Sequence, residues 1–155
     1  MLLNRRGEYA ILGLIFLAKR QNGSPESTFC DVGEVARATQ VPANLLRVVF
    51  FELAKSEILR SQRGAHGGFA LGRPAGEITL RDVIETVQGP IAPFACVSTD
   101  AEPADCDHFD SCELYGVLRS IRTKVLDELA RHTLADLAQA NNGQSVGNEP
   151  STFTV

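Results

Sequence analysis

The sequence lacks an apolar run long enough to cross a membrane. Its longest run, from Ala10 to Ala18, is far shorter than the roughly 20 residues that a bilayer requires. Two arginines precede this run, as in a signal peptide, but Glu8 stands just before it, and Lys19 and Arg20 occupy the place of a cleavage site. We therefore expect a cytoplasmic protein without membrane contact.

Several motifs of enzymes and zinc sites are also absent. The chain contains no Cys-x-x-Cys and no His-x-x-x-His, and its glycine-rich segment 63–68 lacks the Gly-Lys-Ser/Thr of a Walker A phosphate loop. A cysteine nucleophile would need a base and an orienting group, and the whole chain has 3 histidines. We therefore expect that the protein is not an enzyme.

Three of the four cysteines, Cys96, Cys106 and Cys112, stand close together. In a reducing compartment such a group favours metal binding or redox sensing over a structural disulfide. Thiolates can hold an iron-sulfur cluster, or zinc if His108 joins them as a fourth ligand. Spacing alone leaves open a third reading, two structural cysteines and a spare. Cys30 lies outside the group and is expected to be a packed thiol.

The net charge of −4 is unevenly distributed. Residues 1–90 carry 11 Lys and Arg against 9 Asp and Glu, a net charge of +2, whereas residues 91–155 carry 4 against 10, a net charge of −6. The acidic residues gather around the cysteines. Because local patches govern phosphate binding more than total charge does, the mildly basic first part remains compatible with nucleic acid.

Hydrophobic spacing predicts three helices in the first part of the chain. Asp31 and Glu34 form a capping pattern at the start of the second helix. Leu46, Phe50 and Leu53 form one stripe of the third helix. Two short helices joined by a tight turn indicate a helix-turn-helix. The three helices are expected over residues 5–20, 31–40 and 42–56.

A small β wing is expected to follow. Residues 58–62 and 69–71 have the character of strands, and the turn 63–68 between them is rich in glycine. Glycine allows positive φ and a close backbone approach, so Arg63 at the tip could enter a minor groove or meet phosphate.

The last part of the chain predicts three further segments. Thr79 and Asp82 cap a helix that Gly89 ends, and Thr133 and Asp136 start a short helix near residue 133. Between them, apolar residues recur at threes and fours over a long helix, which near its end is expected to have little of its own domain to pack on. A partner helix would cover it. The recurring residues are Leu114, Val117, Leu118, Ile121, Val125, Leu126 and Leu129.

The segment Arg5–Ala10, the helix pair, the segment Arg63–Leu71 and the three spaced cysteines before a long helix resemble the Rrf2 family of winged-helix transcription regulators. The resemblance covers the chain from Met1 to about Ala138. It implies a mainly α fold with a small β wing, a winged helix-turn-helix followed by a long C-terminal dimerisation helix. The expected parts are the DNA-binding domain (1–90), a cysteine-bearing cluster loop (91–111), the dimerisation helix with a short terminal helix (112–140) and a disordered tail (141–155).

The resemblance implies a homodimeric regulator, in the first place a repressor, that binds a palindromic operator in double-stranded DNA. Its cluster, [2Fe-2S] or [4Fe-4S], on Cys96, Cys106 and Cys112 would respond to redox state, nitric oxide or iron status. Tyr115 stands where the cluster-assembly branch has a histidine ligand. Glu8 matches a carboxylate ligand that the nitric-oxide-sensing branch donates from the partner subunit. His108 is the competing choice, and a small molecule or no fourth ligand is the remaining alternative. A zinc-stabilised or cluster-free protein switched by cysteine oxidation is the alternative.

On the DNA side, Asn44 and Arg47 lie on the early, outward part of the third helix, which enters a major groove in such modules. Arg47 could pair with guanine or be a solvated charge. The other expected DNA-binding residues, directed at phosphate or the minor groove, are Lys55, Arg60, Arg63 and His66.

Overall fold

The computed structural model describes residues 4–21, 29–64, 67–92, 95–98 and 111–140. Within these residues no helix is both long and apolar enough to span a membrane. The described elements are α1 (Arg5–Gln21), α2 (Val32–Thr39), α3 (Ala43–Lys55), β1 (Leu59–Gln62), β2 (Gly68–Leu71), the 3-10 helix η1 (Ala75–Glu77), α4 (Leu80–Gln88), the 3-10 helix η2 (Ala95–Val97), α5 (Tyr115–Arg131) and α6 (Leu134–Ala140).

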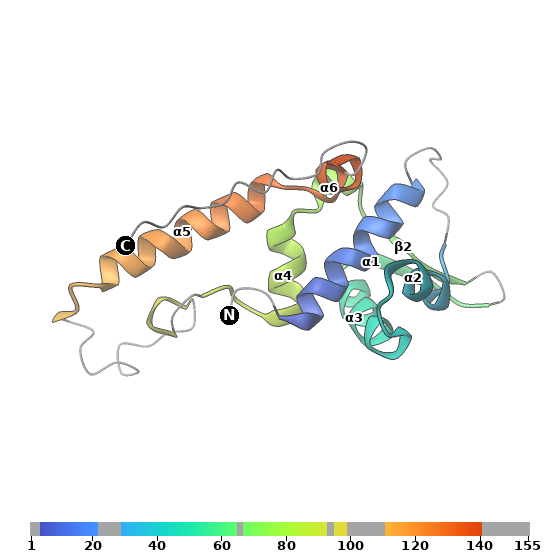
Figure 1. Ribbon diagram of the computed structural model, residues 1–155, viewed down its shortest axis with the longest axis horizontal. Helices are drawn as coiled ribbons and strands as arrows, with labels where there is room; N and C mark the ends of the chain where they lie inside the picture. The colour runs from blue at the N-terminus through green and yellow to red at the C-terminus, as the bar shows by residue number, and fades with distance from the viewer. Residues whose placement is uncertain (1–3, 22–28, 65–66, 93–94, 99–110, 141–155) are drawn as a thin grey trace, which may run out of the picture.

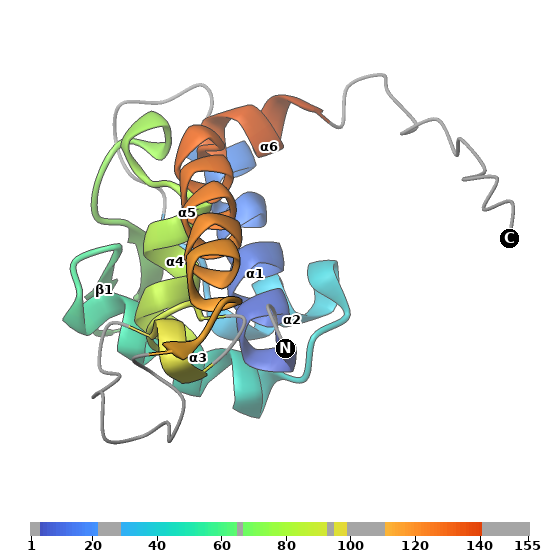
Figure 2. The same cartoon turned by 90° about the vertical axis from the view of Figure 1, so that its left-hand side faces the viewer.

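Helix α1 is the central element, in contact with α2, α3, α4 and α6 (Figures 1 and 2). Leu14 and Leu17 are buried in the core, while Leu12 on the other side is 39% exposed. Gly13 allows α3 to approach closely, because a Cβ atom at this position would lie 2.7 Å from the ring of Phe50. The apolar run therefore has one buried side and one partly open side.

The predicted helix-turn-helix is confirmed. The carboxylate of Asp31 caps α2 by accepting the N–H of Gly33 at 2.8 Å. Glu34 was expected to complete the capping pattern, but it forms an ion pair with Arg20 at the end of α1 instead. Gln40 ends α2 in the left-handed conformation, with φ of 58°. Helix α3 buries the predicted stripe, which consists of Leu46, Phe50 and Leu53.

The predicted wing is an antiparallel pair in which Leu59 lies opposite Leu71. The outer edge of β2 is anchored to the chain before α2, since Phe69 and Cys30 exchange two backbone hydrogen bonds of 2.9 Å. Gly68 makes this approach possible. Its φ is 153°, and a Cβ atom would lie 2.2 Å from the carbonyl oxygen of Cys30.

Helix α4 begins and ends where the sequence predicts. Thr79 and Asp82 form a reciprocal capping box, with both hydrogen bonds at 3.1 Å. Gly89 ends the helix with φ of 82°.

Helix α5 projects from the rest of the described chain (Figure 1). Its C-terminal half packs on α4, where Leu126 is buried with Ile84 and Ile91. The expectation that the helix has little to pack on near its end is therefore wrong, because the large apolar side chains that stay exposed belong to its first turns. The exposed large side chains there are Leu114 (63%), Val117 (55%) and Ile121 (42%).

Helix α6 returns the chain to the core beside α1. The N–H of Leu134 donates to the carbonyl of Ile78 at 2.9 Å, and Leu134 is fully buried. Thr133 and Asp136 cap α6 as predicted, and these hydrogen bonds from Thr133 lower the pKa of the Asp136 carboxyl. The short terminal helix thus shares the core of the winged helix and fixes the C-terminal end of α5.

Candidate functional site

The outer side of α3 and the wing border one shallow hollow. Arg47 and Phe51 of α3 line it together with Gln62 and Gly64 of the wing. The aromatic rings hold the two elements together, because Phe69 of β2 makes edge-on contacts with Phe50 and Phe51, with centroid distances of 5.2 and 5.4 Å. Helix and wing therefore present a joint surface.

The expected DNA-binding residues that the structure describes are exposed. Asn44 and Arg47 lie in the first turns of α3, and Arg60 is held over the ring of Phe29 at 5.4 Å. Within the described ranges, the cations of this surface have no carboxylate at ion-pair distance, so they are available to phosphate. They are Arg47, Lys55, Arg60 and Arg63; His66 lies outside the described residues.

The start of α1 is tied to α3 and to α4. A guanidinium nitrogen of Arg6 donates to both carboxylate oxygens of Glu52, at 2.5 and 2.6 Å. Asn4 caps α1 by accepting from the N–H groups of Arg6 and Gly7, and its own N–H donates to Gln88 at 2.9 Å. A movement of the first turn of α1 would therefore also shift α3, which forms part of the joint surface with the wing.

Glu8 lies in that first turn and is exposed. Its carboxylate is 3.6 Å from the guanidinium of Arg5, one turn back. A role of Glu8 as a metal ligand would depend on a partner subunit. The structure leaves this role as a prediction.

Two of the three grouped cysteines are described. Cys96 lies in η2 and Cys112 lies three residues before α5; both are half-buried, and no disulfide joins the described cysteines. Segment η2 packs against α5, and both views place it beside the N-terminal half of that helix (Figures 1 and 2). Cys106 and His108 lie outside the described residues. Within the described part no three potential ligands come together.

Cys30 is a packed thiol, as predicted. It is 1% exposed at the junction of the wing and α2. Burial raises the pKa of its thiol above the ordinary value, although the guanidinium of Arg20 opposes this shift. A protonated, buried thiol is a poor ligand, so Cys30 is separate from the cysteine group in chemistry as well as in position.

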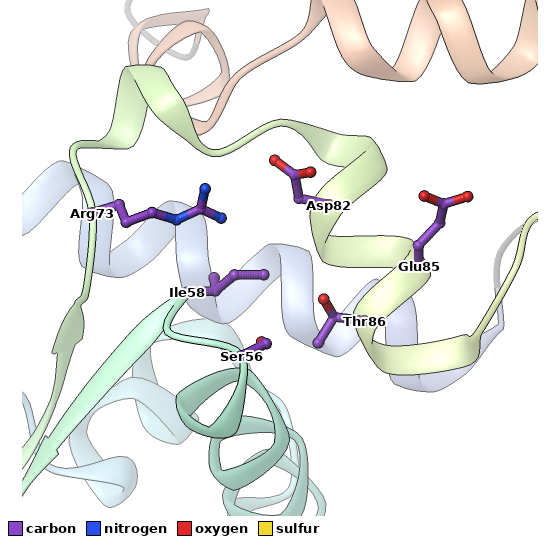
Figure 3. A pocket seen from close by; sticks show the side chains of 6 residues that line it. All are labelled: Ser56, Ile58, Arg73, Asp82, Glu85 and Thr86. Atoms are coloured by element: carbon purple, nitrogen blue, oxygen red, sulfur yellow. The ribbon is translucent and has the colours of Figure 1, made fainter.

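A second hollow lies between the end of α3, the residues that lead into β1, and α4 (Figure 3). Arg73 and Asp82 face one another across it, whereas Glu85 points away. Local structure uses most of its polar groups, because Asp82 caps α4, Glu85 pairs with Arg81 at 3.0 Å, and the Ser56 hydroxyl donates to a backbone carbonyl of α3. We assign no ligand to it.

Comparison with known proteins identifies the family. The profile of Rrf2, described as an iron-dependent transcriptional regulator, matches residues 3–140. The chain belongs to the Rrf2 family. Its relatives include protein aau3 of Rhizobium meliloti, 33% identical over 90% of this chain and 86% of the relative. The HTH-type transcriptional regulator CymR of Bacillus subtilis is 31% identical over 93% of this chain and 94% of CymR.

Solved structures share the fold. The structure of CymR, the global cysteine regulator of B. subtilis, superimposes with a TM-score of 0.70 and 28% identity, covering 92% of this chain and 99% of CymR. IscR of T. potens gives a TM-score of 0.66 at 21% identity, covering 94% of each chain, which shows the fold alone. CymR and further relatives from Mycobacterium tuberculosis and Rhodobacter capsulatus are named as HTH-type transcriptional regulators. This Rrf2 protein is accordingly a DNA-binding transcriptional regulator with a winged helix.

Two features of the site were missed from the sequence. Arg6 and Glu52 are 46 residues apart, so no local sequence pattern predicts their contact. The outer side of α3 also exposes large apolar residues, which were not among the expected DNA-binding residues because those were charged or carried an amide or imidazole group. These residues are Leu45, Val48 and Phe51.

Proposed function

We propose that this Rrf2 protein is a homodimeric repressor whose affinity for a palindromic operator is set by an iron-sulfur cluster. Cys96, Cys106 and Cys112 hold the cluster, and Glu8 of the partner subunit completes it. The observation that carries the proposal is the direct tie from the first turn of α1, which bears Glu8, to α3 through Arg6 and Glu52.

DNA binding rests on the joint surface of α3 and the wing. The first turns of α3 enter the major groove, where Asn44 and Arg47 meet base edges. Lys55, Arg60 and Arg63 neutralise phosphate, and the wing tip reaches the adjacent groove. The lack of ion-pair partners for these cations within the described chain supports this role.

The dimer rests on the first half of α5. Leu114, Val117 and Ile121 are spaced by three and four residues along one side and are exposed in a single chain. Water contact with such a stripe is unfavourable, and a second copy of the helix would remove it. Two winged helices held in this way bind two half-sites related by a two-fold axis.

The cysteine group suits a soft metal centre. Cys96 and Cys112 are half-buried and belong to neither hydrophobic core cluster, whereas Cys30 is packed in the main core. Thiolates of this kind hold iron-sulfur clusters, which supply chemistry that is sensitive to redox state and to small oxidants. A carboxylate is a harder ligand for iron than a thiolate, so Glu8 is the weak point of the set.

The link from Glu8 to DNA runs through α1. A cluster held by Glu8 and by the partner's cysteines would fix the first turn of α1 relative to the partner's cysteine loop, and that constraint would be absent without the cluster. Arg6 then carries the change to Glu52 on α3, and Asn4 carries it to Gln88 on α4. The operator responds because the two positions of α3 differ in affinity for it.

A cluster-free thiol switch, or a zinc site, is the second candidate. The observation in its favour is the relationship to CymR, which is named a global cysteine regulator. In that case Cys96 and Cys112 act through reversible oxidation of their half-exposed thiols.

The absorption spectrum of protein isolated without oxygen separates these candidates. A cluster protein is brown, and Cys96→Ala, Cys106→Ala and Cys112→Ala should each abolish the colour, whereas Cys30→Ala should not. Glu8→Ala should keep a cluster with an altered spectrum. Colourless parent protein would exclude the cluster. An unchanged Glu8→Ala spectrum beside an altered His108→Ala spectrum would move the fourth ligand to His108.

A further inference from the structure

The outward side of α3 carries large apolar side chains that the fold does not use. Leu45, Val48 and Phe51 are 45%, 53% and 52% exposed, whereas the opposite side of the helix buries its stripe fully. Phe51 has a packing partner, because its ring meets Phe69 of the wing. Leu45 and Val48 belong to neither core cluster of the described chain. Packing within the described chain therefore gives these two apolar side chains no role.

The surrounding charges indicate what that molecule is. Arg47 lies between the two apolar positions in the sequence, and Asn44 and Lys55 are exposed on the same outward side of α3 as Val48. A second protein chain seated here would have to place a carboxylate against each of these cations, because burying them unpaired is strongly unfavourable. Duplex DNA neutralises them with phosphate and also offers an apolar group in its major groove, the C5-methyl of thymine.

We propose that Leu45 and Val48 read thymine methyl groups of the operator. The inference rests on the proposed DNA binding and adds specificity determinants to it. Residues three apart on a helix are separated by about 4.5 Å along its axis. Successive base pairs rise by about 3.4 Å, so the two side chains meet thymines on neighbouring base pairs. The operator half-site should therefore carry two adjacent A·T pairs beside the pair that Arg47 contacts.

Replacing thymine by deoxyuridine tests this directly, since it removes the methyl group and leaves base pairing intact. Operators are first selected from random duplexes with the full-length protein, and each thymine of a half-site is then replaced in turn. We expect a loss of affinity of about fourfold at one or two positions, the effect of one buried methyl group. Deoxyuridine outside the half-sites serves as the DNA control.

The protein side of the test is a double-mutant cycle. For each of the variants Val48→Ala and Leu45→Ala, we expect one thymine position at which replacement by deoxyuridine no longer changes the binding affinity. Lys55→Ala, which removes a phosphate contact, should weaken both operators and keep the fourfold difference between them. Because both apolar residues are exposed, these variants should fold like the parent, which circular dichroism checks.

The outcomes separate the inference from the function on which it rests. A deoxyuridine effect that survives in both alanine variants would overturn the assignment to Leu45 and Val48. If no thymine position responds while a defined operator is still bound, methyl reading is wrong and DNA binding stands. If no sequence is enriched from random duplexes, specific operator binding fails and the inference fails with it.

Discussion

At the scale of single residues, Gly13 shows how one absent atom sets the position of the recognition helix. A Cβ atom there would lie 2.7 Å from the ring of Phe50 and 3.0 Å from a methyl group of Leu46. Both side chains are fully buried, so neither can move aside freely. The close contact of α1 with α3 thus depends on this glycine.

Gly13→Ala should therefore destabilise the protein by about 1 to 3 kcal/mol through overpacking. Urea unfolding should show a lower midpoint with an unchanged slope. Gly116→Ala in α5 is the matched control, because nothing lies within 4 Å of the added atom. That variant should be neutral or more stable by up to about 1 kcal/mol, as expected from helix propensity. Equal midpoints for the two variants would contradict the packing described.

Two arginines of the DNA surface should behave differently. Arg47→Ala should relax the choice of one base pair per half-site, by about 1 to 3 kcal/mol. Arg63→Ala should weaken all sequences alike if it meets phosphate, and should alter the preference for narrow minor grooves if it reads shape. Binding titrations at several salt concentrations measure both effects. Arg119→Ala is the control, because it removes one positive charge from α5, outside this surface. If Arg119→Ala lowered the DNA affinity as much as Arg47→Ala and Arg63→Ala do, neither Arg47 nor Arg63 would belong to the DNA-binding site.

At the scale of elements, α5 has two distinct halves. Its C-terminal half is fixed by Leu126 and by the Arg122 side chain, which donates to the carbonyl of Ile91 at 3.0 Å. Its N-terminal half carries the exposed stripe and begins three residues after Cys112. A dimer formed through this stripe would thus place the cysteine segments next to the partner chain.

Ile121→Asp should weaken the dimer by at least about 3 kcal/mol, because it places a charge in an apolar seam. This corresponds to more than a hundredfold in the dissociation constant. Sedimentation of metal-free protein at micromolar concentration measures it, and the parent should remain dimeric. Thr123→Asp, on another side of the same helix, should have little effect. A stable parent monomer under these conditions would exclude the α5 dimer.

Local sequence signals predicted the elements well. The capping box of Thr79 and Asp82, the cap of Asp31 and the helix end at Gly89 each involve only a few neighbouring residues, so the sequence pattern alone predicts them.

Contacts between distant segments were not predictable in this way. The tie from Asn4 to Gln88 spans 84 residues. The packing of the C-terminal half of α5 depends on the contact between α6 and α1, and hydrophobic periodicity does not predict this contact. The cysteine ligands and Glu8 stay predictions for the same reason, since they would meet across two chains.

At the scale of the whole molecule, the described contacts connect the first turn of α1, the recognition helix α3 and the segment that carries Cys96. The first turn of α1 holds Glu8, contacts α3 through Arg6 and contacts α4 through Asn4. Helix α4 leads to η2 with Cys96, and η2 packs against α5. In a dimer, a change at the cysteine segments would reach both recognition helices together.

The most direct test of this coupling is the operator affinity of one anaerobic preparation before and after its cluster is removed by oxidation and iron chelation. We expect the affinity to change at least about tenfold, a coupling free energy of roughly 1.4 kcal/mol. Cys112→Ala should have the affinity of the stripped protein under both conditions. Equal affinities of the intact and stripped parent protein would contradict a cluster-controlled regulator.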